Sequence, residues 1–116
     1  MKLVISIVQA YDTDKLLRAI VEKGLRATKI SSVGGFLRMG NATILMAVRD
    51  DEVATAIDLI RDTCKSRVEV KIEPALTEYM EWYPAGVHDV TVGGAVVFVV
   101  PISRMVRIME DGVIDV

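Results

Sequence analysis

The residues best suited to bind a ligand lie in one segment, 26–41, which is rich in glycine and in basic side chains. Its glycines can present backbone N–H groups to an anion, and its basic side chains can pair with phosphate oxygens. An aromatic face for stacking and an amide that both donates and accepts complete the parts of a nucleotide site. The residues concerned are Arg26, Lys29, Gly34, Gly35, Phe36, Arg38 and Asn41. Because the spacing matches neither a P-loop nor a dinucleotide fingerprint, an ordinary loop between two strands remains an open alternative.

Residues of the types that act as nucleophiles or bases are scarce. The single cysteine, Cys64, falls on the predicted apolar face of a helix, where thiols are usually inert. The single histidine, His88, has no evident partner, and a packing or surface role is the simpler interpretation. The carboxylates between residues 69 and 81 lack the spacing of a cation-binding loop. We therefore predict no catalytic residue, no metal site and no cofactor.

Composition narrows the class of protein. With 116 residues, 52% hydrophobic and 26% charged, residues 1–116 are expected to form a single folded domain. The formal net charge of −2 offers no basic excess for binding nucleic acid. The apolar start, residues 1–8, is too short to span a bilayer and no cleavage site follows. Together with a lone cysteine, these features predict a cytoplasmic protein without a membrane segment.

Hydrophobic periodicity predicts five elements in the first part of the chain. Asp12 supplies a capping oxygen before the first helix, and Gly24 fits a left-handed helix end. Apolar residues at helical spacing define the second helix. The predicted elements are strands over 3–8, 26–33 and 42–48 and helices over about 13–23 and 52–64.

The second part of the chain has weaker patterns. Strict alternation over 68–72 predicts a strand with one solvated face. From 73 to 86 the periodicity disappears and two prolines enter, so we predict a long loop with nothing to hold it in one conformation. Two strand-like runs, 87–92 and 95–100, flank a pair of glycines and predict a hairpin. The tail from Ile102 has no strong pattern.

The strongest elements follow the order βαββαβ, which predicts an α+β, ferredoxin-like fold: an antiparallel sheet with two helices on one face, plus an extra hairpin or strand. Apolar residues stand on both faces of the first strand, 3–8, although helices can cover only one face. Copies of the chain are therefore expected to bury the other face.

Several segments together resemble the PII-like cyclic-di-AMP receptor proteins. The similarity covers about residues 1–66 continuously and resumes around 87–103. It is carried by residues 5–9 (ISIVQ), 26–29 (RATK), 34–38 (GGFLR), 40–41 (GN) and 92–99 (VGGAVVFV).

This resemblance implies a PII-like homotrimer with cyclic-di-AMP sites between neighbouring subunits, which signals without catalysis through changed loop conformation and an unknown protein partner. It also implies that Thr28 and Asn41 hydrogen-bond an adenine edge and that Arg26 faces phosphate. The other implied ligand-binding residues are Ala27, Gly35, Phe36, Leu37, Arg38, Ala47, Phe98 and Arg107.

The sequence departs from the family pattern at three places. Residues 67–78 replace a Met-Gly-Gly-Ser-Ala-Asp-containing loop, Ala47 replaces a glycine, and Arg107 stands near an expected glutamine. Alternatives therefore stay open: a PII-like sensor of ATP, ADP or another adenine nucleotide, a small phosphate-ester or acyl-phosphate hydrolase on the same scaffold, and a trimer that has lost binding.

Overall fold

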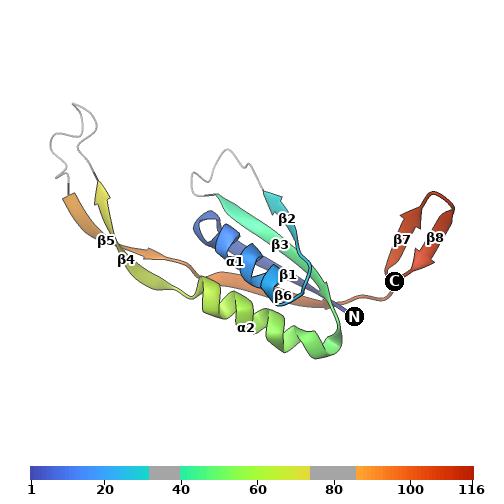
Figure 1. Cartoon of the computed structure of the whole chain (residues 1–116). Coiled ribbons are helices and arrows are strands. Elements are labelled where there is room, and N and C mark those ends of the chain that lie inside the picture. Colours follow the sequence, from blue (N-terminus) through green and yellow to red (C-terminus); the bar gives the residue numbers. More distant parts are fainter. Residues whose placement is uncertain (32–39, 74–85) are drawn as a thin grey trace.

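The computed structural model describes residues 1–31, 40–73 and 86–116 (Figure 1). The predicted glycine-rich loop, apart from residues 40 and 41, and residues 74–85 of the predicted long loop lie outside these ranges. In chain order the elements are β1 (Lys2–Gln9), α1 (Ala10–Glu22), β2 (Thr28–Ser31), β3 (Asn41–Val48), the 3₁₀ helix η1 (Asp50–Glu52), α2 (Val53–Cys64), β4 (Arg67–Glu73), β5 (Gly86–Val92), β6 (Ala95–Pro101), β7 (Val106–Met109) and β8 (Gly112–Asp115).

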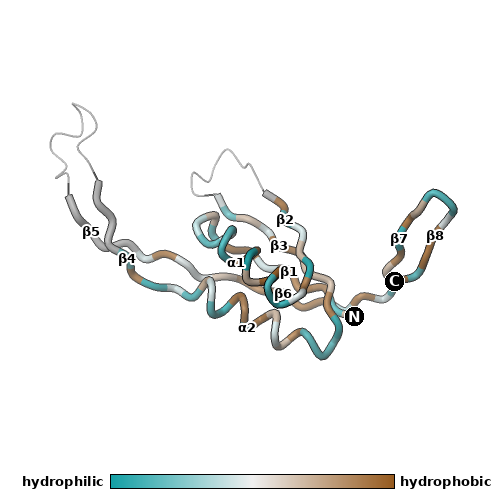
Figure 2. Tube along the Cα trace, viewed as in Figure 1, coloured by the Kyte–Doolittle hydropathy of each residue, from teal (hydrophilic) through white to brown (hydrophobic). Residues whose placement is uncertain are grey.

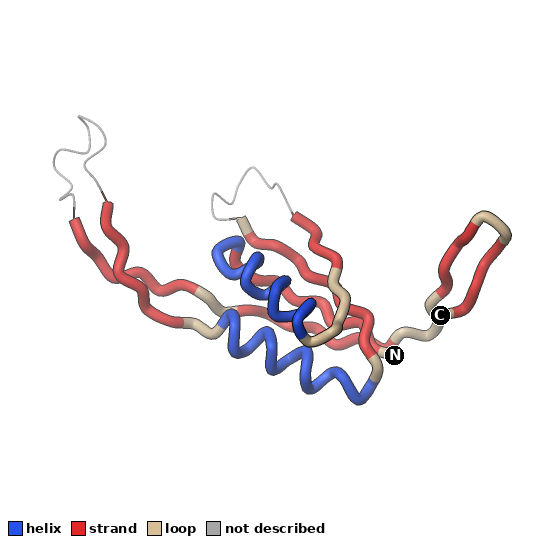
Figure 3. Tube along the Cα trace, in the orientation of Figure 1, coloured by secondary structure: helices blue, strands red, loops and turns tan. Residues whose placement is uncertain are grey.

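A four-stranded antiparallel sheet forms the centre of the fold. Its strand order is β2-β3-β1-β6, and α1 and α2 lie side by side on one face (Figure 3). The path β1-α1-β2-β3-α2-β6 is the βαββαβ order, with the β4–β5 hairpin inserted between α2 and β6. The predicted ferredoxin-like α+β fold is therefore confirmed.

The core lies between the helices and one face of the sheet. Alternate residues of β1 and β3 point into it, as a period of two requires, and the two helices contribute one stripe each. Ala56 takes part in the α2 stripe, whereas the neighbouring Ile57 is 38% exposed. The buried cluster consists of Val4, Val8, Leu16, Ile20, Ala42, Ile44, Met46, Val48, Ala56, Ile60 and Cys64.

The opposite face of the sheet is apolar and no described element covers it. Ile5 pairs with Phe98 on one side and Leu45 on the other, so the three side chains lie across this face. Phe98 is 51% exposed, and Ile7 and Val96 are exposed beside it. The prediction of apolar residues on both faces of the first strand is thus confirmed.

Helix α1 begins at Ala10, earlier than predicted, because Asp12 is not its cap. The Asp12 side chain is fully buried inside the first turn, and its Oδ1 accepts a hydrogen bond from Arg67 at 2.7 Å. The predicted helix end is confirmed: Gly24 has a φ of 76° and donates its N–H to the carbonyl of Val21 at 2.9 Å.

The prediction of a hairpin turn at Gly93 and Gly94 is wrong. Strand β5 pairs with β4 and strand β6 pairs with β1, so the two glycines carry the chain from the inserted hairpin into the central sheet. Both have a φ of 90°, a conformation that other residues rarely adopt. The N–H of Gly94 donates to the carbonyl of Cys64, which joins this crossing point to the end of α2.

The tail contains a hairpin that the sequence patterns did not predict. Strands β7 and β8 pair antiparallel around the turn Glu110-Asp111, and Gly112, which has a φ of 142°, follows this turn as the first residue of β8. All residues of both strands are exposed, and hydrophobic residues lie along each of them (Figure 2). The inserted β4–β5 hairpin and the C-terminal β7–β8 hairpin extend from opposite ends of the central sheet (Figure 1).

In the described part of the chain, no helix has the length and apolarity needed to cross a membrane.

The two glycines at the crossing point should respond differently to alanine. A Cβ at Gly94 meets nothing within 4 Å, so Gly94→Ala adds only the positive-φ cost of roughly 1–2 kcal/mol. A Cβ at Gly93 lies 2.5 Å from the backbone oxygen of Lys65 and must displace it as well. Urea unfolding at one protein concentration should show a clearly larger loss of stability for Gly93→Ala, and equal losses would contradict this close approach of Gly93 to Lys65.

Candidate functional site

A cavity of about 360 Å³ lies on the uncovered side of the sheet, between the β2–β3 pair and the C-terminal segment. Its floor comes from β3, where Leu45 and Ala47 stand on the face opposite the core. Its lining residues are Arg26, Ala27, Thr28, Leu45, Ala47, Met105, Arg107 and Val116.

Local structure explains how β2 and β3 position the first part of the lining. Helix α1 ends at Glu22, and the chain then turns at Gly24 so that Arg26 and Ala27 precede the first residue of β2. Thr28 pairs with Leu45 in the antiparallel register, which places both side chains on the uncovered face. The exposed Arg26 and Thr28 therefore face the cavity from one edge of the sheet.

The C-terminal segment forms the other wall. The N–H of Val116 donates to the carbonyl of Met105 at 3.0 Å, which closes the base of the β7–β8 hairpin. Arg107 follows on β7, where it pairs with Ile114 and is exposed. Through this hairpin, residues far from β2 in sequence reach the same cavity.

The cavity lining combines charged and polar groups with apolar side chains. Arg26 and Arg107 carry guanidinium groups that can pair with phosphate oxygens, and the Thr28 hydroxyl can both donate and accept a hydrogen bond. Leu45 and Met105 offer apolar surface against which a planar ring can pack. This combination suits a ligand with an anionic part and a flat, weakly polar part.

Of the eleven residues that the resemblance assigns to the ligand, five line the same cavity. Arg26, Ala27, Thr28, Ala47 and Arg107 share the cavity. The remaining residues are Asn41, Phe98 and the loop residues Gly35, Phe36, Leu37 and Arg38, of which the last four lie outside the described part of the chain.

Asn41 and Phe98 do not line the cavity of a single chain. Asn41 begins β3 and pairs with Gln9, four residues from Leu45, which is roughly 13 Å along an extended strand. Phe98 lies on β6 and is separated from β3 by β1. Both are exposed, so each could contact a ligand that another subunit also holds.

Sequence reasoning missed Leu45, Met105 and Val116. Leu45 stands two residues before Ala47 on a strand, so the strand period alone could have identified it. Met105 and Val116 reach the cavity only because of the β7–β8 hairpin, for which Gly112 beside the turn is the one local signal.

A second, more apolar groove of about 240 Å³ lies between α2 and β6. Cys64 contributes to it, but burial raises the pKa of the thiol to about 11, so the thiol stays protonated near neutral pH. In the ranges that the structure describes, no three Cys, His, Asp or Glu side chains gather as metal ligands would. The groove therefore shows no group poised for chemistry.

Comparison with known proteins agrees with the fold and with the segments noted in the sequence. The crystal structure of a functionally unknown protein from Pediococcus pentosaceus ATCC 25745 matches with a TM-score of 0.71 and 34% sequence identity, over 91% of this chain and 95% of that one. The family model described as "Cyclic-di-AMP receptor" matches residues 1–108, from the first strand into β7. This chain therefore belongs to the PII-like cyclic-di-AMP receptor family.

Proposed function

We propose that this protein is a non-enzymatic signalling receptor that binds cyclic-di-AMP in the cavity beside β2 and β3, at sites completed between the subunits of a homotrimer. One observation carries the proposal. Five residues that the family resemblance assigns to the ligand, drawn from three separate parts of the chain, line one cavity. The pairing of β2 with β3 brings residues 26–28 beside residue 47, and the C-terminal hairpin adds residue 107 to them.

Each part of the cavity has a task in this proposal. Arg26 and Arg107 neutralise phosphate charge, with hydrogen bonds that are stronger because both partners are ionised. Thr28 hydrogen-bonds an adenine edge, while Leu45 and Met105 pack against the base. Among the described residues that line the cavity there is no histidine and no carboxylate side chain to activate water, which favours binding over hydrolysis.

The size of the cavity supports a site shared between subunits. About 360 Å³ is near the lower end of the range for small-molecule sites, whereas a cyclic dinucleotide is a large ligand with two bases. One chain therefore supplies only part of the required surface. Asn41 and Phe98, both exposed and outside the cavity of their own chain, would reach the ligand from a neighbouring subunit.

Two unpartnered apolar surfaces support assembly. One is the uncovered sheet face around Ile5, Leu45 and Phe98, and the other is the β7–β8 hairpin, in which Ile108 is 81% exposed. A two-stranded hairpin alone is marginally stable in water, so a second surface is expected to cover it. When two different surfaces of identical chains pack together, the copies form either a closed ring or an open helical assembly, and not a two-fold pair. A trimer satisfies that requirement.

Binding should depend on the cavity residues and not on charge in general. Arg26→Ala should weaken cyclic-di-AMP binding about 10- to 100-fold, because a hydrogen bond to a charged group contributes ~1.5–3 kcal/mol. Thr28→Val should weaken it about three- to tenfold through loss of one neutral hydrogen bond. Lys29→Ala is the matched control, since Lys29 is exposed on the same strand but its side chain alternates to the opposite face.

Calorimetric titration of the four proteins with cyclic-di-AMP, cyclic-di-GMP, ATP, ADP and AMP measures these effects. Wild type should bind cyclic-di-AMP most tightly, with Lys29→Ala within about twofold of it. Tightest binding of ATP or ADP would favour the adenine mononucleotide sensor instead. Equal effects of Arg26→Ala and Lys29→Ala would place the site elsewhere.

Assembly should depend on the C-terminal hairpin. Light scattering of the wild type is expected to give about 38 kDa, three times the chain mass of 12.8 kDa. Ile108→Asp puts a charge on the hairpin and should shift the protein toward monomer, because burying that charge is costly. Val21→Asp is the control, since Val21 is 70% exposed on α1, away from the uncovered sheet face. A monomeric wild type at micromolar concentration would refute the trimer.

A further inference from the structure

The β7–β8 hairpin has two faces, and only one of them reaches the ligand cavity. Arg107 stands opposite Ile114 in the antiparallel register. Met105, two residues earlier, is joined to Val116 by a backbone hydrogen bond. Opposite residues share a face and successive residues alternate, so these four side chains lie on one face. The hairpin residues that line the cavity, Met105, Arg107 and Val116, all belong to that face, so register and cavity agree that Arg107 points toward the ligand site.

The reverse face of the hairpin carries an ion pair. Arg104 lies three residues before Arg107, and its Nε donates to Oδ1 of Asp115 at 2.9 Å. Asp115 stands opposite Val106, so this pair lies on the face away from the cavity. The charge of Arg104 is therefore offset within the hairpin, whereas that of Arg107 is directed to the cavity.

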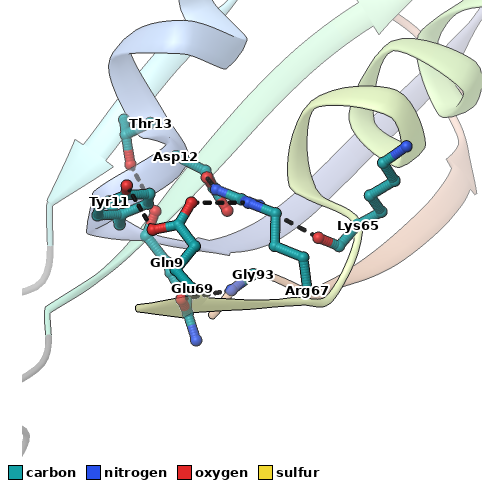
Figure 4. Close-up of polar contacts among 8 residues, drawn as sticks. All are labelled: Gln9, Tyr11, Asp12, Thr13, Lys65, Arg67, Glu69 and Gly93. Carbon is teal, nitrogen blue, oxygen red and sulfur yellow. Dashed lines mark hydrogen bonds and ion pairs between the residues drawn. The ribbon is translucent and has the colours of Figure 1, made fainter. Parts of the chain in front are cut away.

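Arg26 and Arg107 bring two positive charges to the cavity without a counter-charge. Within the described residues neither guanidinium forms an ion pair, and the described lining contains no carboxylate. Arg67, by contrast, pairs with both Asp12 and Glu69 (Figure 4). Two like charges in one cavity repel each other, and a ligand with a single negative charge offsets only one of them. The cavity is therefore matched to a ligand that carries at least two negative charges.

We propose that Arg107 is a specificity-determining residue: together with Arg26 it forms a two-cation site that selects ligands with two phosphate groups over ligands with one. The identity of the nucleotide in this inference rests on the proposed function. Arg26 reaches the cavity from the edge of the sheet, and Arg107 reaches it from the C-terminal wall. Two phosphates at different positions of one ligand can then each meet a guanidinium, which binds phosphate oxygens through paired N–H groups. A cyclic dinucleotide has this arrangement of phosphates.

Three adenine dinucleotides separate the effect of charge from recognition of the bases. Cyclic-di-AMP has two phosphates in a ring, linear pApA has two phosphates without the ring, and linear ApA keeps both adenines but has one phosphate. In calorimetric titration the wild type should bind cyclic-di-AMP and pApA about 10- to 100-fold more tightly than ApA. That range is the contribution expected of one hydrogen bond to a charged group.

Removing the charge of Arg107 should remove this preference. Arg107→Gln should weaken binding of cyclic-di-AMP and pApA about 10- to 100-fold but change that of ApA less than about threefold. Its binding of cyclic-di-AMP should also depend less on salt, because one charge no longer takes part. Arg107→Lys keeps the charge without the planar fork and should retain part of the preference.

Arg104→Gln is the matched control. It removes the same charge from the reverse face, and an exposed ion pair such as Arg104–Asp115 contributes little to stability. All three affinities should therefore stay within about threefold of the wild type. Arg107 is exposed, so thermal unfolding and light scattering should also be unchanged in Arg107→Gln.

The outcomes for Arg107→Gln decide the inference. Equal losses for all three dinucleotides would overturn it, because Arg107 would then act on the bases or on the fold and not on a second phosphate. Unchanged affinities would overturn it too. If the wild type binds none of the dinucleotides, the proposed function is refuted and inorganic pyrophosphate decides the two-cation site alone. Pyrophosphate should raise the melting temperature of the wild type more than that of Arg26→Ala or Arg107→Gln, and an equal rise, or none, would overturn the site.

Discussion

The sheet has two apolar faces, and two helices can cover only one of them. On the helix side, alternate residues of β1 and β3 are sealed in the core. On the other side, Ile5, Leu45 and Phe98 form a bare surface that a single chain does not bury. The candidate cavity opens on that bare side, and the apolar β7–β8 hairpin forms part of its wall. The same constraint therefore underlies both the proposed location of the site and the proposal that further copies of the chain complete it.

Apolar burial holds the layers together but is not directional, so charge and hydrogen bonds fix how the inserted hairpin leaves the core. Asp12 lies at the centre of this arrangement, because its buried carboxylate accepts a hydrogen bond from Arg67 at the base of β4. The hairpin direction is consequently set by one turn of helix.

Local patterns in the sequence were sufficient for β1, α2 and the βαββαβ order, since continuous or periodic apolar runs reflect burial directly. They were insufficient where contacts between residues far apart in the sequence determine the structure. Aspartate is a common helix cap, but Asp12 is buried in the core, where it pairs with Arg67, 55 residues away in the sequence. Gly93 and Gly94 indicate a turn, yet the pairing of β6 with β1 determines that the turn joins two sheets. For the site, family resemblance identified Thr28 and Arg107, whereas no local signal shows that a C-terminal hairpin brings Met105 to β3.

The most direct test of the account is a crystal structure of the protein grown with cyclic-di-AMP. We expect the ligand to lie against β2 and β3 of one subunit, with a phosphate within hydrogen-bond distance of Arg26 or Arg107 and with a neighbouring subunit covering its exposed side. A ligand held wholly within one chain would contradict the shared site. A ligand in the groove between α2 and β6, with the cavity beside β2 empty, would contradict the account as a whole.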